Sequence, residues 1–212
     1  MIRHRADLPE TLPLFVLPGA VLMPRARLPL NIFEPRYLQM VEDVLKTPHR
    51  LIGMIQPLDE AGEVLAQVGS AGRIVGFQEQ DDGRYLVWLG QVSRFRLAAA
   101  EQGFQPYPIG HADWSGYEPD LGETEADPGL NRAAFLDLAR RYMAAHDLST
   151  DWDAASEAEA ELLVNSLAMA LPLEVPDKQA LLEAATLPER RALLEGLLEY
   201  ELRGGESDEV MQ

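Results

Sequence analysis

The sequence predicts an α+β protein, in which a small, partly closed β-barrel with one inserted helix precedes a C-terminal bundle of helices. Three observations support this class. Short apolar runs broken by Gly and Pro fill residues 12–110, as is typical of many short strands. From Leu130 onward, apolar residues recur at helical spacing instead. The charge is also unevenly distributed along the chain. Residues 1–110 hold 12 acidic and 11 basic residues, whereas residues 111–212 hold 23 acidic and 7 basic residues.

The composition excludes several classes of protein. The 212 residues are 47% hydrophobic, which is enough for a sizeable core. Cysteine is absent, so disulfides, thiolate metal sites and cysteine nucleophiles are excluded. The net charge of −17 opposes binding to nucleic acid and to anionic lipid, so neither partner is expected. Residues 1–10 lack the apolar segment of a signal peptide, and no apolar run reaches membrane-spanning length, so we expect a soluble cytoplasmic protein.

The first strands surround a helix. Residues 14–17 form an apolar run that ends at Pro18-Gly19, and residues 21–23 form a second that ends at Pro24. An extended segment follows at residues 28–32, where Pro29 is typical of an edge strand. Helical spacing then begins at Pro35 and ends before Pro48.

The remaining strands include one clear hairpin. Residues 73–77 and 85–89 flank Asp81-Asp82-Gly83, and Asp-Gly readily adopts the positive φ of a tight turn. Gly90 predicts a bulge or bend before the next strand. The other expected strands are residues 51–55, 64–68 and 92–97.

The second half is predicted to be helical. Two capping boxes are expected, Ser156 with Glu159 and Thr186 with Glu189, and Gly204-Gly205 is expected to end the last helix. The expected helices are 131–146, 156–171, 177–185 and one from about 187 to 203. The predicted organisation is therefore a β-rich pseudobarrel (1–112), a connecting loop (113–129), a helical subdomain (130–205) and a frayed acidic tail (206–212).

Neither an ATPase nor a protease site is evident. Lys46 and Lys178 are the only lysines, and neither follows the glycine-rich loop that binds nucleotide phosphates. Both are expected to be solvated and not paired with a serine. Ser93 and Ser115 lack a nucleophile-elbow pattern. The four histidines lack metal-ligand spacing, so no catalytic residue, metal or cofactor is predicted.

The aromatic residues in strand patterns are expected to be core residues. Arg94 and Arg96 flank Phe95 and should therefore both point away from that core. Two such arginines are too few to indicate an RNA-binding surface. The aromatic residues concerned are Phe15, Phe77, Trp88 and Phe95.

Three segments together resemble the amino-terminal domain of ATP-dependent Lon proteases. They are LPLFVLPGAVLMPRARLPLNIFEPRY (12–37), QVGSAGRIVGFQEQDDGRYLVWLGQVSRFRL (67–97) and LPLEVPDKQALLEAATLPERRALLEGLLEYELR (171–203). The resemblance implies a PUA-like β pseudobarrel followed by a helical bundle. It also implies a role in recognising unfolded or tagged protein substrates and in assembling the hexamer. No catalytic residue is carried over, because those of the family lie in modules for which this sequence shows no motif.

The leading hypothesis is a non-catalytic protein that binds exposed apolar polypeptide segments, as an adaptor or regulator in protein quality control. Candidate contacts are Met23, Phe33, Tyr37 and Trp88, because flexible apolar and aromatic groups suit varied segments. Three alternatives stay open: a PUA-like RNA-binding protein, a hydrolase that uses paired carboxylates between barrel and helices, and a docking subunit for a Lon-type or other ATPase. The sequence leaves the oligomeric state and any small-molecule ligand undetermined.

Overall fold

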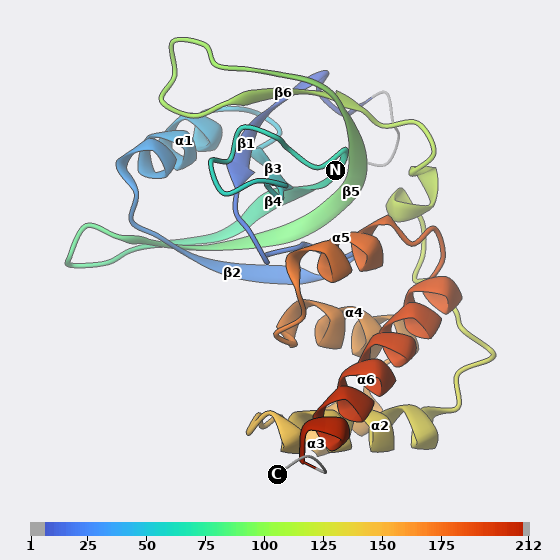
Figure 1. The fold of residues 1–212 in the computed structure, drawn as a ribbon. Helices are drawn as coiled ribbons and strands as arrows, with labels where there is room; N and C mark the ends of the chain where they lie inside the picture. The colour runs from blue at the N-terminus through green and yellow to red at the C-terminus, as the bar shows by residue number, and fades with distance from the viewer. Residues whose placement is uncertain (1–6, 210–212) are drawn as a thin grey trace.

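A computed structural model describes residues 7–209 (Figure 1). The N-terminal half is a sheet of six strands in the order β2-β5-β4-β3-β1-β6, and β6 also pairs with β5, which closes five of the strands into a ring. The β1–β3 pair is parallel and the other pairs are antiparallel. The strands are β1 (Thr11–Val16), β2 (Arg27–Ile32), β3 (Leu51–Ile55), β4 (Val68–Glu79), β5 (Tyr85–Glu101) and β6 (Ile109–Asp113).

The long strand β5 belongs to two parts of the sheet. Its first residues pair with β2, and its last residues pair with β6. The β4–β5 hairpin turns where the sequence predicts, with Gly83 at φ +81°. Residue Val92 interrupts the β4–β5 register, two residues beyond Gly90. The segment 92–97 is therefore a continuation of β5 past an irregularity and not a separate strand.

One helix is inserted among the strands, as expected. Helix α1 (Pro35–Leu45) begins at a proline, whose missing N–H costs nothing in the first turn. Its inner face buries Tyr37, Met40 and Val41. The predicted strand at residues 64–68 is wrong. Those residues form a compact loop with a single bridge between Pro57 and Leu65, and β4 begins only at Val68.

The C-terminal half is helical and lies to one side of the barrel (Figure 1). A short 3-10 helix, η2 (Glu118–Leu121), lies in the connection. The α-helices are α2 (Arg132–Ala145), α3 (Trp152–Glu157), α4 (Ala160–Ala170), α5 (Val175–Glu183) and α6 (Leu187–Glu209). Among the residues that the structure describes, no helix is both long and apolar enough to cross a membrane.

The expected helix ends are partly confirmed. Thr186 and Glu189 form the reciprocal capping box, with Glu189 N–H donating to Thr186 Oγ1 and Thr186 N–H donating to Glu189 Oε2. The Ser156 box is wrong, because Asp151 caps a separate short helix and Ser156 Oγ donates to the Asp153 carbonyl. Helix α6 also continues through Gly204-Gly205 to Glu209, and the rest of the expected frayed tail, 210–212, lies outside the described residues.

The barrel has its own small core. Leu14, Phe95 and Trp114 are buried inside the ring, and the Phe95 and Trp114 rings meet edge to face at 5.7 Å. A second, larger core packs α1 against the outside of the sheet and continues through the helical half without a break. The charge division in the sequence therefore does not coincide with a division of the hydrophobic core.

Two aromatic residues are less buried than expected. Phe15 and Phe95 lie in the core as predicted, whereas Phe77 is 42% exposed and Trp88 is half-buried. Phe77 lies near the end of β4 and packs edge to face on Tyr85.

Candidate functional site

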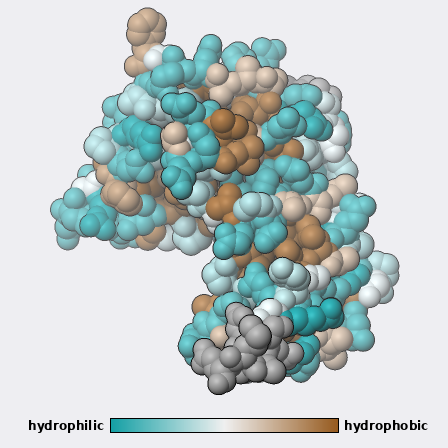
Figure 2. Space-filling view, in the orientation of Figure 1, coloured by the Kyte–Doolittle hydropathy of each residue, from teal (hydrophilic) through white to brown (hydrophobic). Residues whose placement is uncertain are grey.

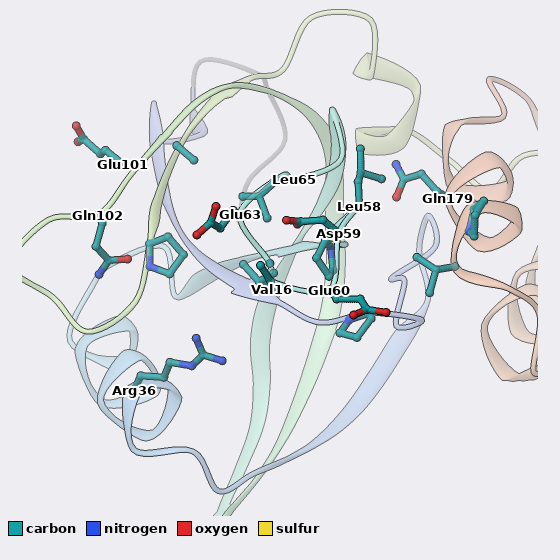
Figure 3. Close-up of a pocket in the computed structure, with 18 of the residues that line it drawn as sticks. Val16, Arg36, Leu58, Asp59, Glu60, Glu63, Leu65, Glu101, Gln102 and Gln179 are labelled. Carbon is teal, nitrogen blue, oxygen red and sulfur yellow. The ribbon is translucent and has the colours of Figure 1, made fainter.

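A large cavity lies between the barrel and helix α5. It has a volume of about 1350 Å³. Figure 3 shows the side chains that converge on it from the loop after β3, the end of β5, α1 and α5. We call this cavity the acidic groove. Its apolar lining includes Val16, Pro18, Pro57, Leu58, Leu65 and Val175.

Carboxylates outnumber cations around the groove. Among residues 7–209, five carboxylates line it and Arg36 is the only lysine or arginine that does so. Arg36 is already paired, because its guanidinium contacts Glu34 at 2.8 Å. The groove therefore combines apolar surface with an excess of negative charge. The five carboxylates are Asp59, Glu60, Glu63, Glu101 and Glu183.

The loop from Pro57 to Leu65 forms one wall and holds its shape through its own hydrogen bonds. Leu58 N–H donates to the Val64 carbonyl at 2.7 Å, and Val64 N–H donates to Asp59 Oδ1 at 2.9 Å. Gly62 turns the chain at φ +72°. In this loop Leu58 is 57% exposed, so the wall presents apolar surface to solvent.

Two buried glutamines fix the opposite wall. Gln56 Nε2 donates to the Val175 carbonyl at 3.2 Å and to Gln179 Oε1 at 3.0 Å. Gln179 Nε2 in turn donates to the Val68 carbonyl at 2.9 Å. Because these bonds join β3 and β4 to α5, the groove is preformed.

Buried arginines hold the helices against the barrel beyond the groove. Arg94 on β5 pairs with Asp120 and also donates to the Leu182 and Ala184 carbonyls at the end of α5. Arg25 likewise pairs with the buried Glu161 of α4. Arg94 and Arg96 both point away from the core around Phe95, as expected, but Arg94 is buried between the barrel and α5 whereas Arg96 is exposed.

The four predicted contact residues do not form one site. Met23 is fully buried and Tyr37 is 1% exposed, so neither can reach a bound polypeptide and both predictions are corrected. Tyr37 is held inside by stacking on Phe15 at 4.1 Å and by donating to the Val16 carbonyl. Phe33 is 63% exposed and Trp88 is half-buried, yet neither lines the groove, and their role stays a prediction.

No catalytic pairing is built around the lysines or serines singled out in the sequence. The Lys178 ammonium donates to the Met169 carbonyl at 3.0 Å, and burial lowers its pKa, so its expected solvation is wrong. Lys46 is exposed and contacts Asp43. The Ser93 hydroxyl donates to the Arg94 carbonyl, and that of Ser115 donates to Asp113 at 2.6 Å. Within residues 7–209, no cluster of three or more metal-ligand side chains occurs.

The residues that build this groove were not identified from the sequence. None of its five carboxylates, nor Leu58 or Gln179, was predicted to contact a ligand. One signal was available: Pro57-Leu58-Asp59-Glu60 puts an apolar side chain between a turn-forming residue and two carboxylates. Nothing in the local pattern links that loop to α5.

Comparison with known proteins gives a consistent result. Residues 11–199 match the family described as the ATP-dependent protease La (LON) substrate-binding domain. The chain is 28% identical over its whole length to 27% of Lon protease 2 from Syntrophobacter fumaroxidans. It is 31% identical over 46% of its length to 13% of Lon protease 2 from Sorangium cellulosum. The chain thus spans about a quarter of the length of the Syntrophobacter fumaroxidans protease.

Two solved structures share the fold. The Lon N-terminal domain protein from Xanthomonas campestris is 29% identical, with a TM-score of 0.61 over 90% of this chain and 98% of that one. The N-terminal domain of the Mycobacterium avium complex Lon protease is 14% identical, with a TM-score of 0.65 over 89% and 98%, which supports the fold alone. The expected pseudobarrel with a helix insert and following helices is confirmed.

Proposed function

Because this chain belongs to the family of Lon substrate-binding domains, we propose that it binds polypeptide segments and that the acidic groove is the binding site. One observation carries the proposal: a preformed cavity with apolar walls and a surplus of carboxylates lies at the junction of barrel and helices. Apolar surface of this kind favours side chains that a folded protein would keep inside.

The size of the groove supports a polymer as the ligand. Small-molecule pockets usually have volumes of roughly 300–1000 Å³. The groove exceeds that range at about 1350 Å³. In the space-filling view, hydrophobic surface gathers near the middle of this face of the molecule, with hydrophilic surface around it (Figure 2).

The charge of the groove supports a particular class of segment. Five carboxylates against one paired arginine complement lysine and arginine side chains. We therefore propose that bound segments carry basic residues next to apolar ones. The same carboxylates oppose nucleic acid in this groove, because phosphates would meet like charges.

The chain would act by holding such segments and not by cutting them. This role rests on the lack of a phosphate-binding loop in the sequence and on the partners of Lys46 and Lys178 described above. An adaptor or regulator in protein quality control would use binding alone. A bound segment would be presented to an ATPase.

Docking on an ATPase partner is a second candidate function, favoured by a different surface. Two further hollows, of about 490 and 370 Å³, lie on either side of helix α4 and share Leu162, Ser166 and Ala170. Leu162 is 55% exposed between them. This apolar furrow is separate from the acidic groove, so the two functions can be tested with different variants.

The test is fluorescence anisotropy with three labelled peptides that share one apolar core and carry lysine, glutamine or glutamate flanks. We expect the lysine version to bind most tightly and the glutamate version most weakly, with the difference shrinking as salt rises. ATP hydrolysis and peptide cleavage are followed in parallel, and neither is expected. Failure of all three peptides to bind would refute the groove as a polypeptide site.

Charge-reversal variants locate the binding. Glu60→Lys with Glu63→Lys changes two carboxylates of the groove, and we expect it to weaken the lysine peptide by about fivefold or more. Glu123→Lys with Glu157→Lys changes the net charge equally at exposed positions outside the groove. Equal losses in the two double variants would mean that the overall charge, and not the groove, attracts the peptide.

A further inference from the structure

Two arginines face each other across a glycine in the sheet. Arg27 on β2 and Arg73 on β4 are both register partners of Gly90 on β5. Residues directly opposite each other on neighbouring strands place their side chains on the same face of the sheet. With neighbouring strands about 4.8 Å apart, the two arginine backbones lie roughly 10 Å apart. Gly90 itself has no side chain there, and the side chain of Val75 packs over it, with Cγ1 3.1 Å from where a Cβ of Gly90 would stand.

This row of residues faces away from the hydrophobic core. The neighbouring Leu89 is fully buried in the core, and side chains alternate between the two faces of a strand. On the outer face, a cavity of about 360 Å³ is lined by Arg27, Arg73 and Gly90, with Asp120 and Leu121 of η2 beside them. We call this cavity the arginine pocket.

The two guanidinium groups are not neutralised within the described part of the chain. Arg73 Nε is buried without a hydrogen-bond partner, and Arg27 is exposed with none among residues 7–209. A buried donor that lacks a partner is costly, and native proteins usually satisfy it with water or an ion. The positive charges of Arg27 and Arg73, which lie on either side of β5, also repel each other.

The other charges of the pocket are already balanced. Arg25 also lines the pocket, but it pairs with Glu161 and donates to the Pro119 and Asp120 carbonyls. The Asp120 carboxylate is occupied by Arg94. The surplus in the pocket is therefore the positive charge of Arg27 and Arg73, in a protein whose net charge is −17.

We propose that the arginine pocket binds an oxyanion, a phosphate or a carboxylate, between Arg27 and Arg73. The planar guanidinium presents paired N–H donors that match the oxygens of both groups. The volume suits a single small group and not a chain. This site is separate from the acidic groove in both position and charge, so it does not depend on the proposed polypeptide binding.

The test is isothermal titration calorimetry of the full chain with inorganic phosphate at about 150 mM salt, where long-range repulsion by the acidic protein is screened. We expect saturable binding that weakens about tenfold or more in Arg27→Gln and in Arg73→Gln. Arg96→Gln is the matched control, because Arg96 is an exposed arginine on β5 that does not line the pocket.

A second titration identifies the source of the anion. N-acetylated diglycine is supplied as the free acid and as the amide, and binding of the acid alone would assign the pocket to a polypeptide carboxyl terminus. Arg27 is exposed, so the loss in Arg27→Gln cannot be attributed to unfolding, and melting curves check Arg73→Gln. The proposal is overturned if neither phosphate nor the free acid saturates, or if Arg96→Gln weakens binding as much as the pocket variants.

Discussion

The side chains of Arg94 and Asp120 form a two-point ion pair inside the protein. Arg94 Nε donates to Asp120 Oδ2 and Nη2 donates to Oδ1, both at 2.9 Å, and both side chains are at most 4% exposed. The same guanidinium reaches the Leu182 and Ala184 carbonyls. One side chain of the barrel therefore fixes both the connecting segment and the end of α5.

Removing one member of this pair should be severely destabilising. Arg94→Met leaves the Asp120 carboxylate buried and largely unpaired, and we expect a loss of about 3–5 kcal/mol in the free energy of unfolding. Arg94→Met combined with Asp120→Leu should lose less than the sum of the two single variants, because no buried charge is left alone. Urea denaturation measures the free energy of unfolding of the single and the double variants. Arg96→Met at the exposed neighbour should change stability by no more than about 0.5 kcal/mol, and a similar loss there would contradict this explanation.

Tyr107 should make stability depend on alkaline pH. Burial, together with the hydrogen bond to Asp43 and its charge, raises the pKa of Tyr107 to about 12. In the unfolded chain the pKa is about 10. The stabilisation is therefore complete below pH 10 and is lost as the pH rises towards 12. Wild type should be more stable than Tyr107→Phe by about 1 kcal/mol at pH 8, and the difference should vanish by about pH 12 in urea melts. Tyr200→Phe, at an exposed position, should show no such trend.

Two glycines should respond oppositely to alanine. A Cβ at Gly69 would lie 2.6 Å from Phe95 Cζ and 2.7 Å from the Met54 carbonyl oxygen, and the backbone oxygen cannot move aside. We expect Gly69→Ala to cost about 1–3 kcal/mol or more, as overpacking does. At Gly204 nothing lies within 4 Å, and the residue is helical. Gly204→Ala should therefore stabilise by up to about 1 kcal/mol. A destabilised Gly204→Ala would mean that the helix ends there, as the sequence had indicated.

Pro29 should protect the free edge of β2. The Ala26 carbonyl accepts from Gln91 N–H, and bonding direction alternates along an antiparallel strand, so the Pro29 nitrogen faces away from β5. An edge position without an N–H is a poor template for a second chain. Pro29→Thr should increase self-association, measured by light scattering after size exclusion. Pro172→Thr, at an exposed position outside the sheet, is the control, and equal association of both variants would exclude the edge as the cause.

The parts of the fold that depend on neighbours in sequence were predictable. Pro35 and the spacing of Tyr37 and Val41 specify α1, and the Thr186 box specifies the start of α6. Strand alternation correctly predicts that Arg94 points away from Phe95, but it takes no account of the carboxylate 26 residues away that holds Arg94 in the interior. Tyr37 was predicted to contact a ligand, but its hydroxyl donates to a backbone carbonyl inside the protein, a partner that the sequence pattern does not reveal.

The candidate groove was out of reach for the same reason. Gln56 meets Gln179 across 123 residues of sequence, and no periodicity encodes that contact. Gly204-Gly205 also has the composition of a helix end, yet here the helix continues through both. Local rules describe what a residue prefers, whereas the groove depends on which distant segments lie together.

The closure of the barrel has a consequence for synthesis of the chain. Strand β1 completes the ring only by pairing with β6, and Thr11 lies opposite His111. A ribosome must therefore deliver about a hundred residues before the first strand finds its second partner. Contacts so distant in sequence form slowly, and until then the nascent first strand keeps one edge unpaired and its apolar side chains incompletely covered. A protein that we propose to bind exposed apolar segments would itself pass through such a state each time it is made.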